Sequence, residues 1–114
     1  MVTDGATNHA LALTRSLGAK GIAVTACEDR RLAKAFYSHY CRDSFVYPCP
    51  RTSVSQFVDR VFERANAGHY EVLFPMTEKA MLPLSLERHR LSSSVKMPIP
   101  THEAIVRAFD KAAI

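Results

Sequence analysis

Residues that could take part in chemistry gather in four short polar stretches of this chain. They are TDGATN at 3–8, ACEDRR at 26–31, YPCPRTS at 47–53 and FPMTEK at 74–79. Each begins where an apolar run ends, and such runs are typical of strands. In parallel α/β sheets, ligands gather beyond the carboxyl ends of the strands. These stretches are therefore the loops in which we look for a site.

The first stretch is the turn in which dinucleotide-binding folds hold a pyrophosphate. It contains one glycine, Gly5, and lacks both the GxGxxG spacing and the GxxxxGK[ST] phosphate-binding loop. The start of a helix near Asn8 still offers free N–H groups and a positive dipole end to an anion. The alternative is that Asp4 and Thr7 only shape and cap the turn.

Acidic residues follow two further strands. Glu28 and Asp29 stand where dinucleotide folds often place a ribose-binding acid, although they can equally complement the next helix N-terminus. Thr77 and Glu78 face the same crevice if the strands are parallel. Glu78 is either a first-turn helix acid or a ligand contact.

The familiar catalytic and metal-binding patterns are missing. The sequence has no GxSxG elbow, HExxH helix or paired CxxC motif. The histidines are scattered without metal spacing at His9, His39, His69, His89 and His102. His39, Cys41 and Cys49 supply a single close ligand pair, and structural zinc usually needs two. The sequence therefore predicts no catalytic group and no metal in this chain, and the odd cysteine number favours no disulfide framework.

Composition narrows the class of protein. With 114 residues, 47% hydrophobic and 23% charged, the chain suits one globular domain. The net charge of +4 is dispersed, whereas a nucleic-acid footprint would be clustered. No run approaches the roughly 18 apolar residues of a membrane span, and the N-terminus lacks the features of a signal peptide. We expect a cytoplasmic protein that binds neither nucleic acid nor membrane.

Strands and helices alternate along the chain and must position these loops. Strands are expected around Val2 and over 21–27, 44–48, 70–75 and 94–100. Helices are expected over 8–17, 30–39, 54–67, 77–91 and 101–114, with a left-handed stop at Gly18, a capping box from Ser53 to Gln56 and a kink or split at Pro83. This alternation predicts an α/β fold, a Rossmann-like three-layer sandwich around a mostly parallel sheet of 4–5 strands.

The order of these motifs resembles the N-terminal domain that precedes the ATP-binding fold of ATP-grasp enzymes. The resemblance is carried by VTDG, ALALTRSLGAKGIAVT, SHYCRDSFVYPCP, YEVLFPMTEKAMLPL and AFDKAAI, and it covers nearly the whole chain. Carbamoyl-phosphate synthase, biotin carboxylase and many carboxylate–amine ligases belong to that superfamily. The resemblance implies a pre-ATP-grasp domain over 1–100. It also implies that 101–114, with Asp110 and Lys111, opens a truncated ATP-grasp portion.

The resemblance also implies a role. This domain would wall one side of an active-site cleft and contact a small carboxylate substrate, without being catalytic itself. Mapped by motif, the substrate-binding residues would be Asp4, Gly5, Asn8, Thr77 and Glu78. ATP and Mg²⁺ would bind to the remainder of the enzyme, which would be the partner of this domain.

Two other readings stay open. One is a stand-alone flavodoxin- or receiver-like module that binds a nucleotide or small ligand. Asp4 would suit a receiver, but SFVYPCP at 44–50 offers no aspartate for phosphotransfer at its strand end. The other is a structural or dimerisation domain, with a homodimer as its expected form.

Overall fold

Two parallel strands form the sheet of the molecule. The computed structural model describes residues 1–30, 33–68 and 70–109. Strand β1 (Val24–Glu28) pairs in parallel with β2 (Cys41–Val46), so that Cys27 lies opposite Phe45. All five residues of β1 are buried, as expected for a strand covered on both faces. Most of β2 is exposed, and β1 is its neighbour on one side.

Single backbone bridges continue the parallel pairing beyond β1. Val2 bridges to Ala26 on one side and to Phe74 on the other, and Val72 bridges to Lys96. The amide of Phe74 donates to the carbonyl of Met1 at 2.8 Å. The lateral order is therefore β2, β1, residue 2, residues 72–74 and residue 96.

The expected sheet of 4–5 strands is not formed as such. The described residues give a small two-stranded parallel sheet within an α/β fold, and the segments at 2, 70–75 and 94–100 contribute isolated bridges. The physical reason lies in the residues that follow each bridge. Asp4 turns the backbone to a positive φ of 57°. Pro75 and Pro98 have no N–H to donate to a longer ladder.

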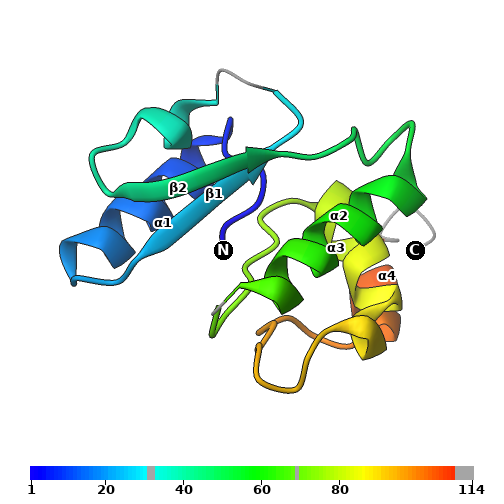
Figure 1. The fold of residues 1–114 in the computed structure, drawn as a ribbon. Coiled ribbons are helices and arrows are strands. Elements are labelled where there is room, and N and C mark those ends of the chain that lie inside the picture. The colour runs from blue at the N-terminus through cyan, green and yellow to red at the C-terminus, as the bar shows by residue number, and fades with distance from the viewer. Residues whose placement is uncertain (31–32, 69, 110–114) are drawn as a thin grey trace.

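The helices lie on two sides of the paired segments (Figure 1). Helix α1 lies against β1 and β2, whereas α2, α3 and α4 are grouped together away from it. The bounds are α1 Asn8–Ala19, α2 Val54–Ala67, α3 Glu78–Leu86 and α4 His102–Phe109, with short 3₁₀ turns η1 at Lys34–Tyr37 and η2 at Arg88–Arg90.

Several expected helix ends and caps are wrong in detail. Gly18 lies inside α1, and the left-handed glycine is Gly21, with a φ of 81°. The helix expected over 30–39 is reduced, in its described part, to η1. The side chain of Ser53 makes no capping hydrogen bond, so the expected capping box at the start of α2 is not formed. Helix α3 continues through Pro83, so it is not split there.

The last described helix, α4, and the segment before it are held against α3 and η2 by polar contacts. Ser85 Oγ and His102 Nδ1 lie 2.7 Å apart. The Arg88 guanidinium donates to the carbonyls of Ile99 and Pro100 at 2.9 and 2.8 Å. The expected Asp110–Lys111 element lies outside the described residues.

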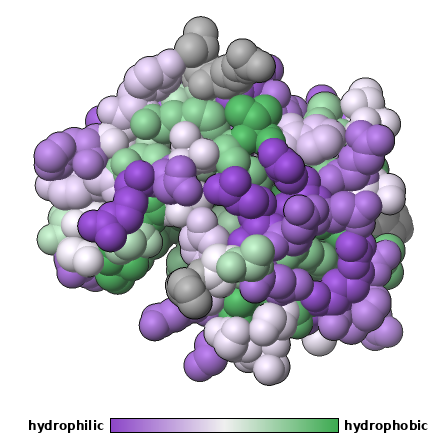
Figure 2. Space-filling model, viewed as in Figure 1, coloured by the Kyte–Doolittle hydropathy of each residue, from purple (hydrophilic) through white to green (hydrophobic). Residues whose placement is uncertain are grey.

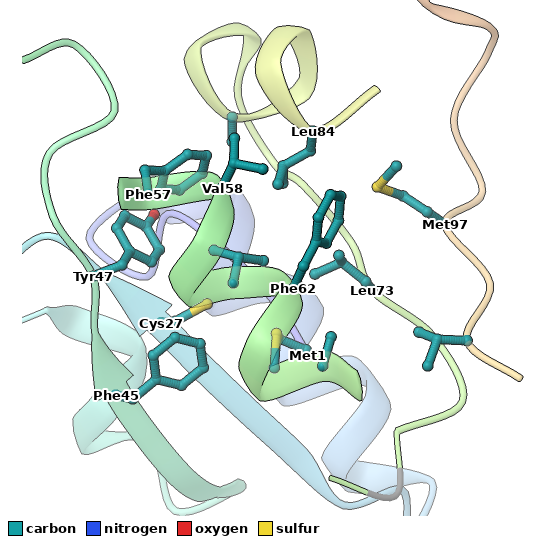
Figure 3. Packing of buried hydrophobic residues seen from close by; sticks show 14 residues of the cluster. Met1, Cys27, Phe45, Tyr47, Phe57, Val58, Phe62, Leu73, Leu84 and Met97 are labelled. Atoms are coloured by element: carbon teal, nitrogen blue, oxygen red, sulfur yellow. The ribbon is translucent and has the colours of Figure 1, made fainter. Parts of the chain in front are cut away.

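The main core forms between the paired segments and α2, α3 (Figure 3). Side chains of α2 such as Phe57 and Phe62 meet Cys27, Leu73 and Leu84 there. A smaller cluster lies against α1 and contains Val2, Ala10 and Val24, with Phe74 packed against it. Met1 belongs to the main core and Val2 to the smaller cluster, so the side chains of these consecutive residues point to opposite sides of the paired segments. Such alternation is typical of an extended chain.

The surface is mostly polar. Figure 2 shows hydrophilic side chains over much of the face that it presents, with hydrophobic side chains gathered between them. Among the described residues, none of the helices has the length and apolar character needed to cross a lipid bilayer.

Candidate functional site

The turn after Val2 is built around a buried carboxyl group. Asp4 is fully buried. Its amide donates to the Tyr47 hydroxyl at 3.1 Å, and its Oδ2 accepts a hydrogen bond from the Thr3 hydroxyl at 2.6 Å. Its carbonyl accepts from both the amide and the hydroxyl of Thr7, which fixes the entry to α1.

Thr3 joins the first turn to the turn that precedes α3. Its Oγ1 accepts a hydrogen bond from the amide of Met76 at 3.0 Å while its hydroxyl donates to Asp4. Residues 73 positions apart in sequence are thereby brought into contact. With the Asp4–Tyr47 and Ala6–Glu28 hydrogen bonds, the structure brings all four polar stretches together at the carboxyl-terminal edge of the paired segments.

Two predicted site residues carry buried polar atoms without a partner. In the described part of the chain these atoms are Asp4 Oδ1, Thr77 Oγ1 and Arg88 Nε, and the first two belong to the adjoining turns. Thr77 precedes α3 as its N-cap, yet its side chain makes no capping hydrogen bond. A buried oxygen without a partner is unfavourable by about 1–3 kcal/mol, so both atoms mark places where a further polar group would be stabilising.

The remaining predicted residues differ in exposure. Gly5 is buried, and a Cβ built on it would lie 3.4 Å from the Phe36 ring. Asn8 is exposed at the start of α1, where its Oδ1 accepts a hydrogen bond from Lys34 Nζ at 2.7 Å. Glu78 is exposed in the first turn of α3. Asp4, Gly5 and Thr77 therefore shape the floor of this edge, while Asn8 and Glu78 lie on its rim.

Glu28 closes the first turn rather than lying open to a ligand. Its Oε2 accepts a hydrogen bond from the amide of Ala6 at 2.9 Å, and its Oε1 accepts one from the amide of Asp29 at 3.0 Å. Burial, with a side-chain hydrogen bond to Asp29, raises the pKa of Glu28. That same hydrogen bond, aided by Lys79 and Arg30, lowers the pKa of Asp29.

Tyr47 belongs to this site although sequence reasoning did not select it. It lies just past β2, is 2% exposed, and its ring meets Phe57 edge-on with centroids 4.6 Å apart. Burial raises the pKa of its phenol, so the hydroxyl stays neutral and can accept from Asp4. The available signal was its position at the carboxyl end of a strand, where an aromatic residue carries a polar group.

The cysteines and histidines do not assemble into a further centre within the described residues. No group of three or more His, Cys, Asp or Glu side chains there is arranged to hold a metal ion. Cys27, Cys41 and Cys49 are free thiols, and burial raises the pKa of Cys27 well above its ordinary value.

Comparison with protein-family models, with curated proteins and with solved structures found no match to this chain.

Proposed function

We propose that this chain is the substrate-side N-terminal domain of an ATP-dependent ligase of the ATP-grasp type. In such an enzyme a carboxylate oxygen attacks the γ-phosphorus of ATP, the bond from that phosphorus to the bridging oxygen breaks, ADP leaves and an acyl phosphate is formed. An amine then attacks the acyl carbon and phosphate leaves. This domain supplies one wall of the cleft, and ATP and Mg²⁺ bind to the rest of the enzyme.

One observation carries the proposal. The two turns that the motif resemblance marks as substrate-facing adjoin each other through Thr3, and each holds a buried oxygen without a partner, Asp4 Oδ1 and Thr77 Oγ1. Thr77 is only partly buried, so a substrate or a neighbouring domain could supply a donor to its oxygen. Asp4 is fully buried, so its part in this wall is to hold the first turn in place.

The proposal extends to the fold. If the paired segments are numbered by their position in the sequence, their lateral order across the fold is 3-2-1-4-5. This is the order of a doubly wound sheet, and the separate side-chain clusters toward α1 and toward α2 agree with helix layers on both sides. We therefore assign the chain to a Rossmann-like three-layer sandwich.

The exposed side chains on this rim suit a small carboxylate. Lys34 places an ammonium beside the Asn8 side chain, and both are exposed. A carboxylate accepts strong hydrogen bonds from an ammonium and an amide N–H together. The proposed role of Glu78, which is exposed in the first turn of α3, is to accept a hydrogen bond from the amine partner of the reaction.

The experiment measures whether the parent enzyme transfers a carboxylate oxygen of the substrate to the released phosphate. The full-length protein is incubated with ATP, Mg²⁺, an amine and a panel of small acids labelled with ¹⁸O in the carboxylate. We expect one ¹⁸O per turnover in the released phosphate, because the acyl phosphate passes a carboxylate oxygen to phosphorus. Asn8→Ala should raise KM for the acid about tenfold, the equivalent of one hydrogen bond to a charged group. Glu63→Ala, an exposed change on α2, is the control.

Two results would contradict the proposal. Phosphate release without label transfer would exclude acyl phosphate formation. Tight Mg²⁺-dependent binding of ATP to the isolated 114 residues, measured by calorimetry, would instead favour a stand-alone nucleotide-binding module.

A further inference from the structure

A carboxylate of the protein already occupies the anion position of the first turn. Glu28 extends from the end of β1. Its two carboxyl oxygens accept hydrogen bonds from the backbone amides of Ala6 and Asp29, at 2.9 and 3.0 Å. Backbone N–H groups in a turn before a helix are what a bound phosphate uses in other α/β proteins. Here an internal carboxyl group accepts from one such amide, that of Ala6, and from the Asp29 amide in the loop after β1, and Glu28 itself is 2% exposed.

Three more amides at this turn and in the first turn of α1 are also engaged. The amide of Gly5 donates to the Cys27 carbonyl, and that of Thr7 donates to the Asp4 carbonyl. The amide of Ala10 donates to the Thr7 hydroxyl at 3.1 Å. A phosphate that binds the Ala6 amide would therefore have to displace Glu28 and approach the carboxyl group of Asp29, whose negative charge disfavours it.

We propose that Glu28 is a specificity-determining residue that closes the first turn to phosphate and nucleotide, and so directs a negatively charged substrate group to the rim. On the rim, Lys34 and Asn8 are exposed and can receive that group. The assignment to a substrate rests on the proposed function. The closure of the turn is a property of this chain alone.

The test compares the 114-residue chain with Glu28→Ala in inorganic phosphate and in chloride at equal ionic strength. In the wild type, the ¹⁵N amide signals of Ala6 and Asp29 should not move with phosphate. In Glu28→Ala these amides become free, and both signals should shift saturably. At phosphate tenfold above its Kd, the midpoint of thermal unfolding of the variant should rise on the order of 5 °C, with no comparable rise in the wild type.

Two further variants separate charge from folding. Glu63→Ala removes an exposed carboxylate from α2 and should respond as the wild type does. Glu28→Gln keeps one accepting oxygen and loses the charge, so its response to phosphate should lie between the two. If Glu28→Ala does not fold in chloride, phosphate should restore its folding.

The outcomes that overturn the proposal are distinct from those that test the ligase assignment. Phosphate-dependent shifts of Ala6 and Asp29 in the wild type would show an open turn. A Glu28→Ala variant that gains no response to phosphate, or is not rescued by it, would show that Glu28 is purely structural. Neither result depends on whether the parent enzyme transfers ¹⁸O.

Discussion

At the scale of single residues, the candidate site is a set of buried polar groups that satisfy one another incompletely. Thr3, Asp4 and Tyr47 form one continuous hydrogen-bonded group, and Glu28 ties the neighbouring turn to β1. Such networks are favourable when every member has a partner and costly when one is removed. The stability of this edge therefore depends on individual hydroxyl and carboxyl groups.

Tyr47→Phe tests this dependence with the loss of one oxygen atom. The buried amide of Asp4 would lose its acceptor, and we expect the free energy of unfolding to fall by about 1–3 kcal/mol in urea denaturation. Tyr37→Phe is the matched control, because the Tyr37 side chain is 70% exposed. Equal stability of both variants would show that the Asp4 amide finds another partner.

The sequence points to the location of the site more readily than to its hydrogen bonds. The stretches around Asp4 and Thr77 could be selected from the sequence because each follows an apolar run. The structure brings the two turns together. The roles of Tyr47 and Glu28 depend on contacts between residues that are 43 and 22 positions apart. No local pattern encodes such a pairing, because it exists only after the segments have packed.

At the scale of elements, similar local sequences lead to different caps. Thr7 and Thr77 both stand at the N-cap position of a helix, where a threonine hydroxyl commonly accepts a hydrogen bond from the backbone. The Thr7 hydroxyl accepts from the Ala10 amide at 3.1 Å, as expected of an N-cap, whereas Thr77 Oγ1 is buried without a partner. Helix position is thus readable from sequence, while the direction of a capping side chain is set by its surroundings.

Replacing each threonine by valine, which has nearly the same shape, should separate these two roles. Thr7→Val removes a cap and should lower the free energy of unfolding by about 1 kcal/mol. Thr77→Val removes a buried hydroxyl that has no partner, and should be neutral or stabilising. Chemical denaturation of the two variants side by side measures the difference. A larger loss for Thr77→Val would mean that its hydroxyl has a partner, such as a bound water.

The strand predictions failed where proline and a positive φ shorten the pairing. The apolar runs at 70–75 and 94–100 do lie beside neighbours in parallel, but the first contributes only two isolated bridges, at Val72 and Phe74, and the second only one, at Lys96. Apolar patterning reports burial, which holds for Leu73 and Met97. It does not report the length of a hydrogen-bonded ladder, which depends on the donors and angles of particular residues.

At the scale of the whole molecule, the segment around Val2 is central although it stands first in the chain. Val2 is fully buried, and it bridges β1 on one side and Phe74 on the other. The Met1 ammonium donates to the Val72 carbonyl, 71 positions away. The radius of gyration is 13.7 Å, close to the about 13 Å of a compact 100-residue domain. Long-range pairing through one short segment therefore connects the two halves of the fold.

Val2→Ala tests whether the two halves unfold as one unit. Loss of two buried methyl groups should lower the free energy of unfolding by about 2 kcal/mol. Hydrogen exchange should then accelerate together at the amides of Cys27 and Phe74, which bond on either side of this segment. Val46→Ala, at a position that is 37% exposed in β2, is the control. Faster exchange confined to one side would show two independent units.

The central place of Val2 has a consequence for synthesis on the ribosome. β1 is made first among the neighbours of Val2. Its other neighbour, Phe74, lies about 70 residues after Val2 and is made well after β2 is complete, and Lys96 follows later still. A nascent chain with the first half complete would present a half-paired inner segment and the apolar surface beside it. Translation at about 5–20 residues per second leaves that intermediate exposed for several seconds. Chaperones that recognise extended apolar segments would have that interval in which to bind.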